Sequence, residues 1–200
     1  MLVFVAIEGL DGAGTTSQVT RLVAWLDAQG RRAHRTFEPS DGPIGRLIRQ
    51  TLKSEPGAPH RSILPWMFAA DRADHLYREI EPKLSAGVAV ITDRYYHSSL
   101  AYQSMEIPLP QVWELNRTFR QPDLTVFVRI DVDTALARIA SRNEQREIFE
   151  QRNQLERISS HYDQVLDFLT NLGHPIAEVD GAGSLDAVTA AVRAEVARVL

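Results

Sequence analysis

Five short apolar runs recur along the chain, each bounded by polar or turn-forming residues. The first run is continuously apolar, as expected for a strand in a parallel sheet that helices cover on both faces. Together the runs predict β-strands at residues 2–7, 33–37, 88–92, 124–130 and 176–179.

Between these runs, apolar residues recur at the three- and four-residue spacing of amphipathic helices. Helices are predicted at 17–28, from about 43 to 52, at about 62–84, from 98 to 103, at 132–142, in a segment that ends at 172, and at 184–200. Pro108 and Pro110 break the chain before a further segment at 111–120. Strands that alternate with helices, without internal repeats, predict one doubly wound α/β domain over residues 1–200. We expect a five-stranded parallel sheet with helices on both faces.

Composition is ordinary for a globular protein with a core, because 44% of the 200 residues are hydrophobic and 24% are charged. The net charge of −4 argues against general binding to nucleic acid or to anionic membranes, which needs a basic surface. The absence of cysteine excludes disulfides and thiolate chemistry. No apolar stretch has the length of a membrane span, and no signal peptide is recognisable, so we expect a cytoplasmic protein.

Polar clusters follow three of the predicted strands, at residues 8–16, at Glu38-Pro39 and at Asp93-Arg94. The carboxyl ends of parallel strands meet at one edge of the sheet, and ligands of such folds bind there. The three clusters therefore predict a single site.

The cluster after the first strand is a glycine-rich turn, E-G-L-D-G-A-G-T-T-S at 8–17, that leads into a helix. It is typical of the phosphate-binding loop G-x-x-x-x-G-K-[ST], although Thr15 stands in the place of the lysine. Backbone N–H groups of such a loop, with the positive end of the following helix, bind phosphate. A glycine-rich turn without a ligand is the alternative. The predicted phosphate-binding residues are Gly9, Asp11, Gly12, Ala13, Gly14, Thr15, Thr16 and Ser17.

Five short motifs follow one another along the chain: E-G-L-D-G-A-G at 8–14, E-P at 38–39, F-A-A-D-R at 68–72, D-R-Y and S-S-L-A-Y-Q within 93–103, and P-D-L-T at 122–125. In this order they resemble the motifs of the thymidylate kinase family, a group of P-loop enzymes of nucleoside monophosphate metabolism. Each motif is weak alone, but five in order are specific, and the likeness runs nearly end to end. The resemblance implies the three-layer P-loop NTPase fold, transfer of phosphate from ATP to dTMP with Mg²⁺, and a homodimer.

The resemblance assigns catalytic and metal-binding residues near the phosphate loop. It places Asp11 near the transferred phosphoryl group, and Arg94 on the acceptor phosphate or on the phosphoryl group in flight. The Thr16 hydroxyl and the Asp93 carboxylate are the expected oxygen ligands of Mg²⁺. Taken alone, Asp93-Arg94 is equally well read as a structural ion pair at the sheet edge.

On the acceptor side, Phe68 and Arg72 lie four residues apart and therefore on one face of a helix. By resemblance, Phe68 stacks on thymine and Arg72 binds the dTMP phosphate, although Phe68 as an ordinary core residue is a serious alternative. The remaining expected substrate-binding residues are Glu38, Pro39, Arg94, Ser99, Tyr102 and Gln103.

A charged stretch at about 142–156 corresponds to the LID of the family, a segment that closes over ATP. Some members carry a catalytic arginine in the phosphate loop, and others supply basic residues from the LID. Because Gly12-Ala13 offers no arginine, the chain resembles the second type, with Arg142 and Arg146 as catalytic residues. Arg152 is better read as part of a solvated helix face.

Two residues depart from the family pattern: Thr15 replaces the lysine of the loop, and Phe37 stands where an arginine usually precedes Glu38-Pro39. A unit charge about 4 Å from a phosphate oxygen contributes roughly 4 kcal/mol at an effective dielectric constant of about 20. Without compensation, its loss lowers the rate by about two to three orders of magnitude.

The missing lysine leaves three interpretations. A LID arginine supplies the charge and the enzyme works; or the chain binds nucleotides but transfers phosphate weakly or not at all; or it phosphorylates another acceptor, such as a deoxynucleoside. The first is favoured because Asp11, Phe68, Arg72, Asp93 and Arg94 are all retained. A deoxynucleoside carries no phosphate for Arg72 to bind.

Overall fold

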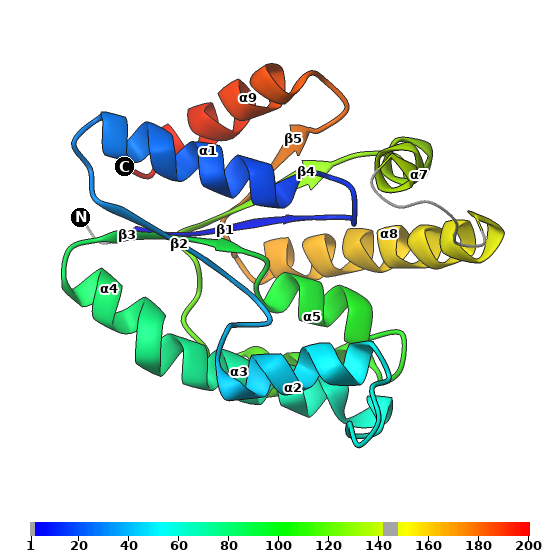
Figure 1. The fold of residues 1–200 in the computed structure, drawn as a ribbon. Coiled ribbons are helices and arrows are strands. Elements are labelled where there is room, and N and C mark those ends of the chain that lie inside the picture. Colours follow the sequence, from blue (N-terminus) through cyan, green and yellow to red (C-terminus); the bar gives the residue numbers. More distant parts are fainter. Residues whose placement is uncertain (1–2, 142–147) are drawn as a thin grey trace.

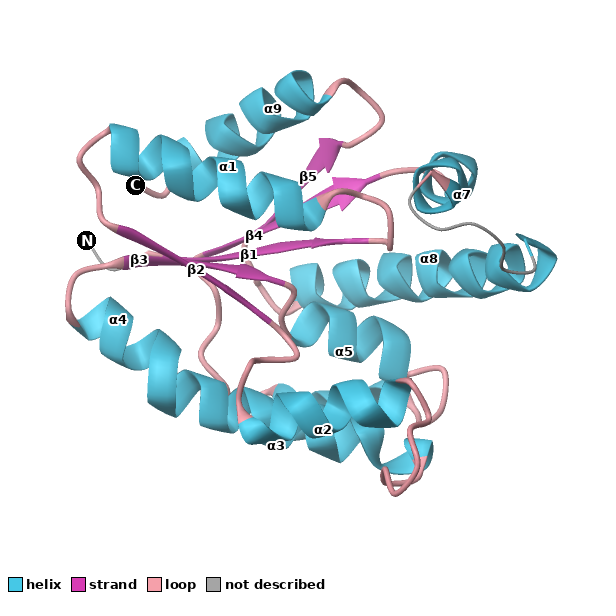
Figure 2. Ribbon diagram, in the orientation of Figure 1, coloured by secondary structure: helices cyan, strands magenta, loops and turns pink. Residues whose placement is uncertain are grey.

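A sheet of parallel strands lies between two layers of helices in the computed structural model, which describes residues 3–141 and 148–200 (Figures 1 and 2). The sheet has the order β2-β3-β1-β4-β5. Its strands are β1 (Phe4–Gly9), β2 (Ala33–Phe37), β3 (Ala89–Asp93), β4 (Leu124–Arg129) and β5 (Ile176–Asp180). The predicted α/β fold with a five-stranded parallel sheet and helices on both faces is confirmed.

Strand β1 is central and every one of its residues is buried, which explains its uninterrupted apolar sequence. Its neighbour β3 places Asp93 opposite Ile7, and β2 places Phe37 opposite Asp93. The carboxyl ends of these three strands therefore lie side by side, as the polar clusters predict.

The helices form two layers of unequal size (Figure 1). On one face α1 (Thr15–Ala28) packs against α9 (Leu185–Ala197). The other face is covered by α2 (Pro43–Leu52), α3 (Leu64–His75), α4 (Glu81–Ser85), α5 (Tyr96–Gln103), α6 (Leu109–Asn116) and α8 (Ile148–Asn171). Helix α7 (Val132–Ala140) lies beyond the end of β4 and packs against α8. In the described ranges, no helix is both long and apolar enough to cross a membrane.

The predicted helix at 62–84 is a run of different helical turns. A 3₁₀ turn at Arg61–Ile63 leads into α3, and a π-helical turn at Leu76–Ile80 separates α3 from α4. Pro82 lies in the first turn of α4, where its missing N–H cannot continue an α-helical ladder from the preceding residues. The wider π-helical turn immediately before it keeps the helical path continuous.

The charged stretch expected as the LID divides at the boundary of the described residues. Residues 148–156 form the first turns of α8, which continues to Asn171. Residues 142–147 lie outside the described residues. The single domain with a LID at about 142–156 therefore stays a prediction.

Candidate active site

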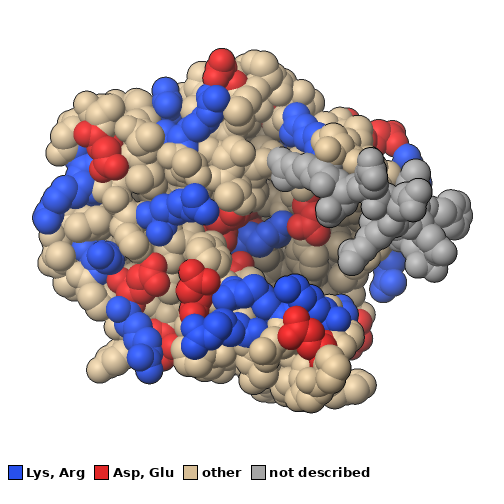
Figure 3. Space-filling view, in the orientation of Figure 1, with Lys and Arg blue, Asp and Glu red and all other residues tan. Residues whose placement is uncertain are grey.

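The phosphate loop joins β1 to α1 at the carboxyl edge of the sheet. Gly12 and Gly14 have φ angles of 88° and 87°, which side chains rarely adopt. Gly14 caps α1 without any side-chain hydrogen bond, so the first N–H groups of the helix are left for a ligand. A cavity of about 410 Å³ opens beside the loop, in the hollow that Figure 3 shows between α1 and α2.

This donor cavity is lined by residues from the loop and from the ends of β2 and β3. They are Leu10, Asp11, Gly12, Gly14, Thr15, Thr16, Ser17, Arg35, Phe37, Glu38, Asp93 and Arg94. Six of the eight predicted phosphate-binding residues are among them. The other two are Gly9, which ends the buried strand β1, and Ala13, which lines a separate cavity.

Thr16 and Asp93, the predicted metal ligands, are in direct contact in the wall of the donor cavity. The Thr16 hydroxyl donates a hydrogen bond to Asp93 Oδ2, while Asp93 Oδ1 is buried without a hydrogen-bond partner among the described residues. Hard oxygen atoms are the ligands that Mg²⁺ prefers, and the ion usually needs only one or two carboxylates when phosphates supply the rest. In the described part of the chain, no cluster of three or more His, Cys, Asp or Glu side chains could hold a metal by itself. The pair therefore fits a magnesium ion shared with substrate phosphates.

Arg94 lies where the donor cavity meets a second cavity. Its Nη2 donates to Asp11 Oδ1 at 2.7 Å, and its Nη1 donates to Ser98 Oγ at 2.9 Å and to the Tyr162 hydroxyl at 3.1 Å. Its φ angle of 70° costs about 1–3 kcal/mol for a residue with a side chain. The hydrogen bond from Arg94 N to the carbonyl of Ile7, at 3.0 Å, helps to hold this conformation.

Glu8, near the end of β1, contacts the same hydroxyl groups, of Ser98 and Tyr162, that Arg94 contacts. Its carboxylate is fully buried and accepts hydrogen bonds from Tyr95 N at 2.7 Å, from Ser98 Oγ at 2.6 Å and from the Tyr162 hydroxyl at 3.2 Å. Burial raises the pKa of Glu8, and the positive charge of Arg94 opposes that rise. The sequence analysis missed Glu8 as a functional residue, although a carboxylate that ends a buried apolar strand was a usable signal.

The second cavity, of about 440 Å³, shares Asp11, Glu38 and Arg94 with the donor cavity. Its other lining residues are Pro39, Leu52, Arg61, Phe68, Arg72, Tyr95, Ser98, Ser99, Tyr102, Gln103 and Gln154. With Glu38 and Arg94 of the shared set, all eight residues predicted to bind the acceptor line this second cavity. We call it the acceptor cavity.

Two aromatic side chains, Phe68 and Tyr102, line the acceptor cavity in different surroundings: one is apolar and the other is charged. Phe68 is only partly buried and packs against Ile48, Leu64 and Met67, so it belongs both to a small apolar cluster and to the cavity. Tyr102 lies near Arg94, whose guanidinium carbon is 5.5 Å from the centre of the ring. Burial raises the pKa of Tyr102 to about 12, so the phenol is neutral.

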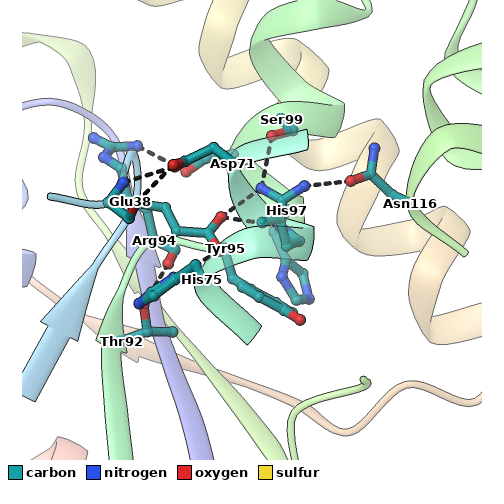
Figure 4. A network of polar contacts seen from close by, with 12 residues as sticks. Glu38, Asp71, His75, Thr92, Arg94, Tyr95, His97, Ser99 and Asn116 are labelled. Atoms are coloured by element: carbon teal, nitrogen blue, oxygen red, sulfur yellow. Dashed lines mark hydrogen bonds and ion pairs between the residues drawn. The ribbon is translucent and has the colours of Figure 1, made fainter. Parts of the chain in front are cut away.

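Arg72, which was expected to bind the dTMP phosphate, has surroundings that differ from those expected. It is completely buried, and Glu38 Oε2 accepts hydrogen bonds from its Nε at 2.9 Å and its Nη2 at 2.6 Å. Nη2 also donates to Ser99 Oγ, and Nη1 donates to Asn116 Oδ1. Figure 4 shows Glu38, Ser99 and Asn116 pointing into this network. Because its charge is balanced inside the protein, Arg72 is one half of a buried ion pair, and its contact with phosphate stays a prediction.

His75 lies on the far side of Glu38. Its Nδ1 is 3.3 Å from Glu38 Oε1, and its Nε2 is 2.7 Å from Thr36 Oγ1. Burial alone would lower the pKa of His75, but the hydrogen bond with Glu38 and the carboxylate of Glu79, 3.7 Å away, raise it to about 9. At neutral pH, Glu38 therefore lies between two cations, His75 and Arg72.

The predicted LID arginines cannot all be placed. Arg142 and Arg146 lie outside the described residues. Arg152, near the start of α8, pairs with Asp133 and lies 3.7 Å from Glu156. These partners agree with the interpretation of Arg152 as part of a solvated helix face.

The sequence analysis also missed a third cavity, of about 330 Å³, on another side of the phosphate loop. Its lining includes Ala13 and Gly14 of the loop, Arg138 of α7 and Gly181 after β5. Arg138 Nη2 donates to the carbonyl oxygen of Gly181 at 2.9 Å, which joins the two segments. The signal was the glycine-rich turn D-G-A-G at 180–183, which follows a strand at the same sheet edge.

The comparisons with known proteins agree on one family. A family model described as "Thymidylate kinase" matches residues 7–181. A probable thymidylate kinase of Pyrobaculum calidifontis is 40% identical over 161 residues, which is 80% of each chain. A putative thymidylate kinase of Aeropyrum pernix is 36% identical over 178 residues, 88% of this chain and 85% of the relative. A thymidylate kinase of Desulfotalea psychrophila is 34% identical over 163 residues, 80% of each chain. With this agreement along most of its length, and with two cavities that meet beside a phosphate loop, the chain belongs to the thymidylate kinase family.

Proposed function

We propose that this chain is a dTMP kinase, which transfers the terminal phosphoryl group of ATP to dTMP and releases ADP and dTDP. The observation that carries the proposal is the pair of cavities that meet at Asp11, Glu38 and Arg94. Direct transfer needs donor and acceptor phosphates side by side, and this junction is the place for them.

On the donor side, the N–H groups of the loop and of the first turn of α1 bind the phosphates of ATP. Thr16 and Asp93 hold the magnesium ion, which when bound neutralises charge on the phosphate oxygens. The cavity beside Arg138 and Gly181 adjoins the loop and is the available place for the base of ATP.

On the acceptor side, Arg94 is the phosphate-binding cation of our proposal. Arg94 lies at the junction and its side chain is 20% exposed, whereas the side chain of Arg72 is buried in the wall. Phe68, Tyr102 and Gln103 line the part of the cavity available to thymine and its sugar.

An ADP-release assay with dTMP, dUMP, thymidine and other nucleoside monophosphates as acceptors tests this function. We expect Mg²⁺-dependent turnover that is fastest with dTMP. Tight dTMP binding without turnover on any acceptor would instead identify a nucleotide-binding protein. Turnover on thymidine but not on dTMP would identify a deoxynucleoside kinase.

The LID arginines keep their proposed catalytic role. Arg142→Ala and Arg146→Ala are each expected to lower kcat far more than they weaken dTMP binding, because a closing segment contacts the transition state. Arg152→Ala is the matched control, since its guanidinium already pairs with Asp133. If neither variant lowers kcat, the LID does not supply the charge that Thr15 lacks.

We further propose a homodimer formed through α3. The residues Trp66, Ala70, Ala73 and Tyr77 are all exposed and recur at helical spacing along α3 and the first residues of the π-helical turn. Trp66 is 52% exposed and Tyr77 is 82% exposed, which makes an apolar stripe that a second copy of the chain would cover. The apolar side chains of Leu64, Met67 and Leu76 in the same stretch are buried and do not belong to this stripe. The cytoplasmic location also stays a prediction.

A further inference from the structure

Arg35 reaches the donor cavity from an element that the sequence analysis did not connect with the phosphate loop. It lies on β2, two residues before Phe37, so both side chains lie on the same face of the sheet. That face is the one covered by α1, because Arg35 Nη1 donates to Thr20 Oγ1 of α1 at 3.1 Å. Both Arg35 and Phe37 line the donor cavity.

Thr20 links Arg35 to Thr16, a predicted magnesium ligand, by hydrogen bonds. The Thr20 hydroxyl donates to the carbonyl oxygen of Thr16 at 2.8 Å, so it lies one helical turn from Thr16. In the sheet, Phe37 pairs with Asp93, which accepts the hydrogen bond of Thr16, and Arg35 pairs with Ile91, two residues before Asp93. Arg35 therefore contacts α1 one turn after Thr16 and lies two residues before Asp93 in the register of the sheet.

Arg35 is also the second basic side chain of this cavity, besides Arg94, which we assign to the acceptor phosphate. The lining contains two basic side chains, Arg35 and Arg94, and Arg94 pairs with Asp11. Among the described residues, Arg35 is exposed and its side chain makes one hydrogen bond, to the neutral hydroxyl of Thr20. A neutral hydrogen bond at the surface is weaker than the charge-assisted, forked contact that arginine makes with phosphate.

We propose that Arg35 binds the phosphates of the donor nucleotide and supplies positive charge that Thr15 lacks. The inference deepens the proposed phosphoryl transfer and rests on it. Within β2, the family's usual arginine before Glu38-Pro39 is Phe37 in this chain, and the arginine of the strand lies at position 35, on the side of the phosphate loop.

Steady-state kinetics of Arg35→Ala test the assignment. ATP is varied at a saturating concentration of dTMP, and dTMP is varied at a saturating concentration of ATP. We expect kcat/KM for ATP to fall by about 10- to 100-fold, because the variant loses a positive charge that contacts the donor phosphates. KM for dTMP and the melting temperature should stay close to wild type, because the side chain of Arg35 is exposed and does not contact the acceptor. Arg35→Lys should recover part of the loss, since it keeps the charge without the fork. Arg117→Ala is the matched control, an exposed arginine that pairs with Glu114 away from the cavities and should leave kcat/KM unchanged.

Thr15→Lys tests compensation directly. It should restore much of the activity of Arg35→Ala and raise that of the wild type by a clearly smaller factor, because the two cations serve the same phosphates. An equal factor in both backgrounds would overturn compensation. Wild-type kcat/KM for ATP in Arg35→Ala, or a loss confined to dTMP, would overturn the donor role.

Binding of a non-hydrolysable ATP analogue separates this inference from the proposed function. Absence of turnover in the wild type refutes the dTMP kinase, but the analogue should still bind Arg35→Ala about tenfold or more weakly than wild type. Equal affinities would overturn the role of Arg35 whatever the acceptor proves to be.

Discussion

Two buried carboxylates, Glu8 and Glu38, hold the arginines of the site in place by different routes. Glu8 acts on Arg94 through the hydroxyls of Ser98 and Tyr162, which contact both the carboxylate and the guanidinium. Glu38 contacts Arg72 directly. A buried charge is tolerated only with such partners. The carboxylates therefore fix the position of each arginine side chain.

Replacement of Arg72 and of Arg94 should separate stability from catalysis. Arg72→Met leaves Glu38 buried without its main partner, and we expect the free energy of unfolding to fall by about 3 kcal/mol. Arg94→Ala removes a partly exposed side chain, and we expect a smaller loss of stability but a fall in kcat of about 100-fold or more. Urea denaturation and the ADP-release assay measure the two effects. These roles would be contradicted if Arg94→Ala lost more stability than Arg72→Met and Arg72→Met lost more kcat than Arg94→Ala.

His75 should make stability fall as the solution becomes alkaline. Its pKa rises from an ordinary 6.5 to about 9 on folding, so its contribution is complete below pH 6.5 and is lost as the pH rises through 9. The shift corresponds to at most about 3 kcal/mol. The pKa of Glu79 is lowered from 4.5 to about 2, chiefly by the nearby His75, so its contribution is complete above pH 4.5 and is lost as the pH falls through 2.

The comparison that isolates His75 is the free energy of unfolding at pH 6 and at pH 9.5, in the wild type and in His75→Gln. The wild type should lose clearly more stability across this interval than the variant. The same loss in both proteins would show that other groups cause the alkaline dependence.

At the scale of elements, the start of α2 is fixed by one close approach. A Cβ atom on Gly45, in the first turn of the helix, would lie 1.9 Å from the carbonyl oxygen of Ser40. Ser40 cannot move aside easily, because its N–H and hydroxyl both donate to the buried Asp71, at 2.7 and 2.6 Å. Helix α2 is therefore held against the segment that follows Glu38-Pro39, and its last residue, Leu52, lines the acceptor cavity.

Gly45→Ala should push α2 away from this segment. Overpacking of this kind costs about 1–3 kcal/mol or more, and the displaced wall should also raise KM for dTMP. Thermal unfolding and dTMP titration measure both. Gly183→Ala is the control for stability, because its Cβ would meet its nearest neighbour at an ordinary 3.6 Å. Equal melting temperatures for the two variants would contradict the tight contact at Gly45.

At the scale of the whole molecule, the site lies where both helix layers meet the carboxyl edge of the sheet. Helix α1 brings Thr16, α5 brings Ser99 and Tyr102, and α8 brings Tyr162. The apolar stripe lies on α3, the helix that contributes Phe68 and Arg72 to the acceptor cavity. Association of two chains through α3 would therefore support the acceptor side of each copy.

Charge on the α3 stripe should separate the proposed homodimer. Trp66→Arg combined with Tyr77→Arg is expected to halve the mass measured by light scattering, because two charges would be buried at the interface. Leu172→Arg is the matched control, since Leu172 is 52% exposed, like Trp66, but lies just after α8. An unchanged mass of the double variant, or a wild type of monomer mass, would contradict this interface.

The local pattern of residues was sufficient for the sheet and the phosphate loop, and the family resemblance named eight of the residues that line the acceptor cavity. Apolar runs predict buried strands wherever helices cover both faces, and parallel strands carry their carboxyl-terminal residues to one edge. Loop glycines follow from a backbone requirement that is itself local. For these reasons the fold class could be predicted from the sequence, whereas the roles of the acceptor residues rest on the resemblance to a family and stay predictions.

Only the tertiary structure decided which charges are free. Arg72 meets Glu38 across 34 residues, and Tyr162 meets Glu8 across 154, so no local pattern could show that one arginine is balanced and the other positioned. Arg35 comes to the phosphate loop because α1 covers β2, a packing choice that periodicity in a single strand does not encode. The residues of the site follow from short-range geometry, whereas the charge that each can offer to a nucleotide depends on partners that only folding brings together.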